Sequence, residues 1–169
     1  YTWDGANRMT ASGSTTYTYN GLNDRVSAGG VTHQLDLNAG LTQVLADGTN
    51  TYLYGAGRLG EQQAVAWQYH LADGLGSVRQ LADASGAISA AKSYEPYGEV
   101  LSNAGSASSA YGFTGEQHSG NLVYLRARFY QTEAMRFTSR DTWTGDPTRP
   151  RSYNLWGYVY GDVINETDP

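Results

Sequence analysis

The sequence predicts an all-β fold, an array of β-hairpins that forms a curved, mostly single-layer sheet spiralling toward a shell. The first observation is a short phrase of aromatic, apolar and turn-forming residues that recurs along the 169-residue chain. Its copies are spaced 16 to 25 residues apart and begin at Tyr1, Tyr17, His33, Tyr52, Tyr69 and Tyr94. A period of about 16 residues accommodates one hairpin of two short strands with its turns, whereas a helical hairpin repeat needs about 34.

The second observation is the strand and turn character inside each copy. In Tyr17-Thr18-Tyr19, a β-branched residue alternates with aromatic residues, which is strand periodicity. Gly tolerates the positive φ that tight turns require. Asp or Asn followed by Gly marks the expected chain reversals at 4–5, 20–21, 47–48 and 73–74. Because a lone hairpin is barely stable, we expect neighbouring repeats to pair laterally into a sheet.

The composition is the third observation, and it favours a thin sheet over a compact globule. Apolar residues make up 40% of the chain and the mean hydropathy is −0.51. The chain has 14 Tyr but only 3 Phe. The apolar body and polar tip of Tyr suit a sheet that is wetted on one or both faces. Cross-strand aromatic pairs, at roughly 0.2–1 kcal/mol each, would stabilise such a sheet.

Charge and residue content exclude several classes of protein. With 16 acidic and 11 basic residues, a net charge of −5 and no basic run, we expect no nucleic-acid partner. The absence of Cys excludes disulfides and thiolate chemistry. We identify no apolar run long enough to span a membrane and no signal peptide, and we expect no cofactor. The chain begins without Met and inside a repeat, so we expect it to be a piece of a longer protein.

Two regions follow from the change in pattern along the chain. Residues 1–100 carry the hairpin array and residues 101–169 form a loop-rich core. We expect a flexible surface loop at 102–110, which is small and polar, and a second loop at 141–152, which is rich in Pro, Gly and Thr. The segment 122–135 has the best helical periodicity, yet it too is interpreted as strand or irregular. A last aromatic strand is expected at 155–160.

These blocks, taken in order, resemble a known family. The tyrosine phrases resemble YD repeats. The later blocks resemble the Rhs repeat-associated core; they are residues 73–79 (DGLGSVR), 94–98 (YEPYG), 113–115 (FTG), 124–130 (YLRARFY), 136–141 (RFTSRD) and 154–160 (NLWGYVY), followed by 167–169 (TDP). The resemblance covers essentially the whole chain. It implies a repeat array that spirals into a hollow β-shell, as in Rhs proteins, the C components of insecticidal Tc toxins and teneurins.

The resemblance also implies a function and partners. In the bacterial members, the shell encloses a variable C-terminal toxin, and an aspartyl autoprotease in the core severs the toxin from the shell. We therefore expect a secreted or cell-surface bacterial protein. Its expected partners are its own toxin domain, which is absent from this chain, and the remaining shell repeats. So few hairpins cannot close a chamber, which leaves a longer shell, oligomerisation, or an exposed sheet edge that favours self-association.

The same resemblance places the catalytic residues at Asp141 and Asp168. Two close carboxylates cannot both ionise, so one acts as the acid while the other acts as the base on a water molecule. A scissile peptide in the same chain supplies the effective concentration for a single turnover. Arg140 matches an Arg that precedes the first Asp, and it is expected to keep one carboxylate charged and oriented.

The sequence departs from the family pattern at two points. The family has Asp-Pro at the first carboxylate, whereas Asp141 is followed by Thr142, and Asp146-Pro147 lies five residues on. Asp146 is therefore a rival for the first carboxylate. The chain also stops before the Gly-Leu that follows Asp-Pro at the family's cleavage site.

The alternative to catalysis is that these Asp residues only cap turns. The chain would then be a structural or adhesive extracellular β-repeat module. Its aromatic strips would be the candidates for carbohydrate binding, although cross-strand ladders within the sheet also explain them. The strips are Tyr17/Tyr19, Tyr52/Tyr54 and Trp156/Tyr158/Tyr160.

Two further patterns have structural interpretations. Residues 55–60 match Gly-x-Gly-x-x-Gly but lack the surrounding βαβ unit of a dinucleotide site, so we interpret these glycines as hairpin turns. The three histidines, His33, His70 and His118, show no metal-ligand spacing. We expect them to be surface residues and expect no metal site.

Overall fold

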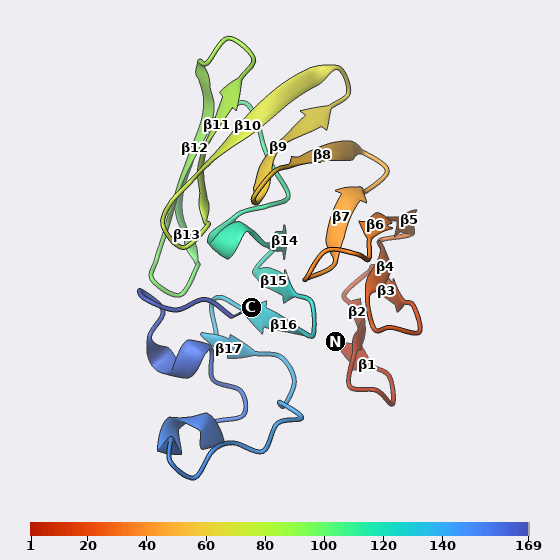
Figure 1. The fold of residues 1–169 in the computed structure, drawn as a ribbon, viewed down its shortest axis with the longest axis vertical. Coiled ribbons are helices and arrows are strands. Elements are labelled where there is room, and N and C mark those ends of the chain that lie inside the picture. The colour runs from red at the N-terminus through yellow and green to blue at the C-terminus, as the bar shows by residue number, and fades with distance from the viewer. Residues whose placement is uncertain (169) are drawn as a thin grey trace. The chain divides into compact units, whose positions relative to one another are not determined.

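The computed structural model describes residues 1–168 and consists of β-strands with three short 3-10 helices in that range (Figure 1). This confirms the predicted all-β fold class. The chain divides into two compact units. The first contains residues 1–71 and 80–89, and the second contains residues 72–79 and the chain from Ala90 onward.

The strands form three antiparallel sheets in which sequence neighbours are spatial neighbours. The first sheet has the order β1-β2-β3-β4-β5. Its strands are β1 (Thr2–Trp3), β2 (Met9–Ser12), β3 (Thr15–Tyr19), β4 (Arg25–Ala28) and β5 (Val31–Thr32). Uninterrupted consecutive order is what an array of hairpins requires.

The second sheet continues the same hairpin order over eight strands, from β13 at one edge to β6 at the other. Its strands are β6 (Gln34–Asp36), β7 (Gln43–Ala46), β8 (Asn50–Tyr54), β9 (Arg58–Gln63), β10 (Ala66–Ala72), β11 (Val78–Asp83), β12 (Ile88–Tyr94) and β13 (Val100–Gly105). Strands β11 and β12 contribute residues to both units.

The third sheet belongs to the second unit and has the order β14-β15-β16-β17. Its strands are β14 (Gln117–Ser119), β15 (Leu122–Leu125), β16 (Arg128–Gln131) and β17 (Arg136–Phe137). The 3-10 helices of this unit are η1 (Phe113–Gly115), η2 (Pro150–Tyr153) and η3 (Val159–Gly161). Strands β15 and β16 confirm that segment 122–135 is not helical.

The repeated tyrosine phrase has one structural explanation in two sheets. In β3 the Tyr19 hydroxyl donates to the carbonyl oxygen of Met9 at 2.7 Å, and in β8 the Tyr54 hydroxyl donates to that of Val44 at 2.9 Å. In each case the acceptor lies on the neighbouring strand of the sheet. The first tyrosine of each pair, Tyr17 or Tyr52, is buried. The tyrosines therefore tie strands of the sheet together.

The hairpin turns follow a different geometry from the predicted one. Of the four glycines that follow Asp or Asn at the expected reversals, only Gly48 has a positive φ (79°). At Asp4, the carboxylate accepts the backbone N–H of Ala6 and the positive φ falls on Asn7 (62°). A type I turn followed by one left-handed residue produces this arrangement. The acidic side chain stabilises the turn, and the left-handed residue comes three positions later.

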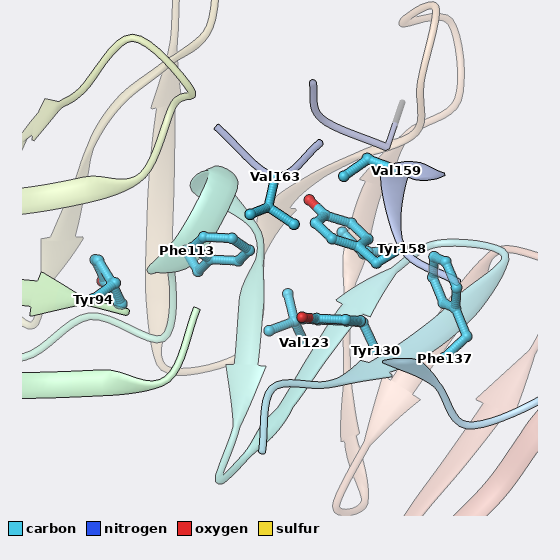
Figure 2. Packing of buried hydrophobic residues seen from close by; sticks show 9 residues of the cluster. Tyr94, Phe113, Val123, Tyr130, Phe137, Tyr158, Val159 and Val163 are labelled. Carbon is cyan, nitrogen blue, oxygen red and sulfur yellow. The ribbon is translucent and has the colours of Figure 1, made fainter. Parts of the chain in front are cut away.

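The main apolar core lies in the second unit and is rich in aromatic residues (Figure 2). The rings of Tyr130 and Tyr158 have their centroids 4.5 Å apart, and the Tyr130 hydroxyl donates to the carbonyl oxygen of Tyr97 at 2.8 Å. Fully burying a large apolar side chain contributes about 1.5–3 kcal/mol. The buried members are Tyr94, Phe113, Val123, Leu125, Tyr130, Phe137, Tyr158, Val159 and Val163.

Two segment predictions were wrong. The segment 102–110 is not wholly a loop, because β13 extends to Gly105 and pairs with β12. The segment 155–160 is not a strand: it has one isolated bridge, at Gly157, and then enters η3. Val159 and Tyr160 both have left-handed φ values, 40° and 53°, which end extended structure.

The histidine prediction was also wrong. His33 is buried, and the side chain of His70 is only 2% exposed beside Glu61. Nε2 of His118 accepts the backbone N–H of Phe113 at 2.9 Å. Burial lowers the pKa of His118 to about 4, so this ring is a neutral acceptor that fixes the loop around η1. Local sequence shows neither the burial nor the acceptor role.

The predicted hairpin turn at residues 55–60 is present between β8 and β9, and it includes Gly55 and Gly57. Gly60 has a different role, because it lies within β9 and pairs with Leu53 on one side and Tyr69 on the other. A Cβ at Gly60 would lie 2.6 Å from the carbonyl oxygen of Gln68. Gly60 therefore allows close approach of a neighbouring strand.

Candidate functional site

A cleft of about 210 Å³ in the second unit contains both Asp residues that the sequence selected. Its lining comes from the start of β16, the segment after β17 that includes η2 and η3, and the last residues described. Those residues are Arg128, Asp141, Trp143, Ser152, Asn154, Leu155, Gly157, Val159, Tyr160, Glu166, Thr167 and Asp168. Asp141 and Asp168 thus share one cleft.

Asp141 is held at both ends of its carboxylate. Its Oδ1 accepts the backbone N–H of Trp143 at 2.8 Å, and its Oδ2 lies 2.8 Å from Nη2 of Arg128. Its own backbone N–H donates to the carbonyl oxygen of Leu155 at 2.9 Å. A carboxylate with a donor on each oxygen is restricted in rotation and suited to carry charge.

Arg128 reaches Asp141 from the first position of β16. Its Nη1 donates to the carbonyl oxygen of Leu155 at 3.2 Å, and its guanidinium carbon lies 3.6 Å from the centroid of the Phe137 ring. Arg126 lies in the turn between β15 and β16, where Leu125 pairs with Arg128. Its left-handed φ of 52° allows this tight turn. The cation is therefore fixed by a carboxylate, a carbonyl and an aromatic face.

The environment of Asp168 favours the protonated form of its carboxyl group over what an exposed aspartic acid would show. Its burial raises the pKa of the carboxyl group, the positive charge of Arg128 lowers it, and the negative charge of Asp141 raises it further. The net direction is upward, because removing the group from water penalises its ionised form. Asp168 thus keeps its proton to a higher pH than an ordinary aspartic acid does, while Asp141 is paired with a cation.

Tyr158 lies in the core next to this site, and it is almost completely buried. Burial raises the pKa of its hydroxyl to about 12, so it remains a neutral hydroxyl at physiological pH. Figure 2 shows its ring among Tyr130, Phe137 and Val163. Tyr158 therefore packs in the core beside the cleft without adding a charge.

Asp146 has the contacts of a turn residue. Its Oδ1 accepts both the backbone N–H and the hydroxyl of Thr148, each at 2.8 Å. These hydrogen bonds, that of the backbone first, lower the pKa of its carboxyl group. Asp146 is not among the residues that line the cleft. The structure brings Asp168 together with Asp141 and not with Asp146.

Arg140 lies outside the cleft lining and is exposed. The cation at Asp141 is Arg128, which sequence reasoning did not select. Its block, residues 124–130, was recognised as a motif, but nothing local distinguishes Arg128 from Arg126. Arg126 instead pairs with Glu116 at 2.7 Å. Only the fold shows which of the two arginines faces the cleft.

Two negative findings apply to the described residues 1–168. They contain no group of three or more His, Asp or Glu side chains arranged to hold a metal ion. No helix in this range is long and apolar enough to cross a membrane.

The geometry can be compared with solved structures. The crystal structure of TcdB2-TccC3-Cdc42 matches with a TM-score of 0.74 and 17% sequence identity, over 99% of this chain and 10% of that chain. This chain has the fold of a segment of TcdB2-TccC3. The structure of TcdB2-TccC3 without its hypervariable C-terminal region matches with a TM-score of 0.69 and 20% identity, over 92% of this chain and 9% of that one.

A Photorhabdus luminescens Tc holotoxin pore with a substituted TccC3 matches as well, with a TM-score of 0.64 and 17% identity, over 92% of this chain and 8% of that one. Tc toxin components are among the proteins that the sequence blocks resemble, so the comparison supports the expected fold. The chain spans about a tenth of the length of TcdB2-TccC3. No protein-family model and no curated protein matches the sequence.

Proposed function

We propose that this chain is a segment of an Rhs-type toxin protein that encapsulates its own toxin. Residues 1–100 would supply wall hairpins and residues 101–169 the associated core. Support comes from the repeat blocks, the all-β hairpin array and the fold shared with TcdB2-TccC3. One of those neighbours is described as lacking a hypervariable C-terminal region. By analogy, the partner of this chain is a toxin domain downstream, and the whole protein is secreted or displayed on a bacterial surface.

We further propose that the core cleaves its own chain. The observation that carries this proposal is the pairing, in one cleft, of Asp141 held by Arg128 with Asp168, whose pKa is raised by burial. Asp141 takes a proton from a water molecule as the water oxygen attacks the scissile carbonyl carbon. Asp168 donates its proton to the carbonyl oxygen. The resulting diol collapses as one of its hydroxyl groups returns a proton to Asp168, the C–N bond breaks, and the leaving nitrogen takes up the proton held by Asp141.

The groups around the pair have supporting roles in this proposal. The backbone N–H of Trp143 orients the Asp141 carboxylate. Arg140 precedes Asp141 in the chain, and we retain the supporting role that the sequence resemblance assigns to it. Because the peptide to be cut belongs to the same chain, a single turnover needs no affinity for an external substrate.

The test is the intact mass of the chain extended beyond Pro169 by its native sequence. The extended wild type is expected to separate into two fragments, while Asp141→Asn and Asp168→Asn stay whole. Asp146→Asn, which alters the turn aspartate, is expected to split like the wild type. Arg140→Ala is expected to split more slowly. An extended wild type that remains intact would refute autoproteolysis. If cleavage is lost in Asp146→Asn but kept in Asp141→Asn, Asp146 and not Asp141 is the catalytic base.

A further inference from the structure

The carbonyl oxygen of Leu155 links Arg128 to Asp141. It accepts the Asp141 backbone N–H at 2.9 Å and Nη1 of Arg128 at 3.2 Å. Nη2 of the same guanidinium lies 2.8 Å from Oδ2 of Asp141. These contacts form a closed ring of guanidinium, carboxylate, backbone and carbonyl. Rotation of the Arg128 side chain would therefore break a hydrogen bond and an ion pair at once.

The Phe137 ring adds a second constraint on Arg128. The guanidinium lies against its face, 3.6 Å from the centroid, and only 14% of the Arg128 side chain is exposed. A planar guanidinium suits this combination of stacking, a hydrogen bond and an ion pair, whereas an ammonium does not. The interaction with Asp141 is only partly screened by solvent, which makes it stronger than a surface ion pair.

The cleft has an excess of acidic groups around this cation. Asp141, Glu166 and Asp168 line it together with the phenol of Tyr160. Arg128 is the one cationic side chain among the described residues of that lining. Its charge acts on Asp168 as well as on Asp141. The position of one guanidinium therefore affects both carboxyl groups of the proposed catalytic pair.

We propose that Arg128 is the positioning residue of this cleft: through its ion pair with Asp141 and its hydrogen bond to the Leu155 carbonyl oxygen, it holds the Asp141 carboxylate in the orientation of the base, and it supplies the positive charge of the cleft that Asp141 shares with Asp168. This inference rests on the proposed function. Arg128 acts through Asp141 and takes no part in bond making. Without Arg128, Oδ2 of Asp141 loses its ion pair, and Asp168 loses the positive charge that lowers the pKa of its carboxyl group.

The first test does not depend on cleavage. The carboxyl carbon signal of Asp168 is followed by NMR through a pH titration of the folded chain. In Arg128→Met its midpoint is expected at higher pH than in the wild type, because the positive charge that lowers the pKa of Asp168 is gone. Arg126→Met removes the arginine that pairs with Glu116 in the same hairpin, and it is expected to titrate like the wild type.

Arg128→Lys keeps the charge and guards against a Met variant that fails to fold. Its Asp168 midpoint is expected to stay near that of the wild type. An unchanged midpoint in a folded Arg128→Met would overturn the inference, and so would a shift in Arg128→Lys as large as that in Arg128→Met.

The second test uses the extended chain and its cleavage rate as a function of pH. In Arg128→Met the acid limb is expected to move to higher pH, which slows cleavage at mildly acidic pH roughly tenfold or more. Arg128→Lys is expected to keep the acid limb and to cleave more slowly at every pH. A uniform loss of rate in Arg128→Met, with no movement of the limb, would overturn the inference. If the extended wild type does not cleave at all, the proposed function fails, and the NMR titration alone decides the role of Arg128.

Discussion

At the scale of single residues, neighbouring charges and burial distinguish carboxyl groups that look alike in the sequence. Asp141, Asp146 and Asp168 all lie in turn-like segments beside Thr, Pro or Gly. Asp146 accepts two hydrogen bonds from Thr148, which lower the pKa of its carboxyl group. Asp168 is instead withdrawn from water, which raises its pKa. The contributions of Asp146 and Asp168 to stability therefore change with pH in opposite directions.

Substitution of Asp168 tests this assignment through stability. Because the folded state raises its pKa, the folded protein binds the proton more tightly than the unfolded chain does. The contribution of Asp168 to the free energy of unfolding is then fully present at pH values below its ordinary pKa. It is lost as the pH rises through the pKa of Asp168 in the folded state. Asp168→Asn, measured by urea unfolding, is expected to raise the free energy of unfolding near neutral pH and to change it little at acidic pH.

Asp146→Asn is the matched control for that measurement. Because folding lowers the pKa of Asp146, this residue stabilises the folded state at pH values above the ordinary pKa of Asp. That stabilisation is lost as the pH falls through the pKa of the folded state. The variant is therefore expected to be less stable than the wild type near neutral pH. Equal effects of the two substitutions at neutral pH would contradict the assignment.

At the scale of elements, the hairpins depend on left-handed residues that follow an acidic or amide turn residue. Gly76, Gly86 and Gly98 occupy this position in the later hairpins, with φ values of 85°, 85° and 89°. Asn7 and Asn23 occupy it in the first sheet. Glycine adopts this φ without strain, and Asn tolerates it better than other residues. The recurring turn chemistry is thus a requirement of the backbone.

Two of these glycines separate backbone strain from packing. A Cβ at Gly98 would lie 2.5 Å from Cδ1 of the buried Phe113, whereas nothing lies within 4 Å of one at Gly86. Gly86→Ala is expected to cost about 1–2 kcal/mol from the left-handed φ alone. Gly98→Ala is expected to cost about 2–4 kcal/mol, since displacement of a core ring adds to that strain.

Chemical denaturation of both glycine variants measures the difference. Equal losses would show that Phe113 moves aside without cost.

The sequence predicted the hairpins but not the conformation of segment 155–160. Period and alternation were enough to identify the hairpins, because both depend on local backbone preference. Segment 155–160 contains aromatic residues with strand spacing, but Tyr158 and Val159 are buried in the core and the backbone turns there. Packing overrode local propensity at that position.

At the scale of the whole molecule, the strand order leaves sheet edges. Strand β13 is one edge of the eight-stranded sheet, and all six of its residues are exposed. It carries no charged residue, and Val100 and Leu101 are 46% and 60% exposed. An uncharged edge strand is a template for pairing with another strand.

We therefore expect this chain, studied by itself, to associate with increasing concentration. Leu101→Lys places a charge on the edge and is expected to shift sedimentation toward the monomer, with little change in the stability of the fold. Ile88→Lys, which changes a 51% exposed residue of the paired neighbour β12, is the matched control. Association that persists in Leu101→Lys, or that is lost equally in both variants, would place the contact elsewhere.

By itself, the sequence determined the all-β class, the hairpin repeat and the selection of Asp141 and Asp168. These depend on local backbone preference and on short motifs, which a linear chain displays. The tertiary structure alone decided that Arg128 pairs with Asp141, that Asp146 is a turn residue outside the cleft, and that burial raises the pKa of Asp168. These properties depend on which charges meet and how far water is excluded, and both arise only when distant segments pack together.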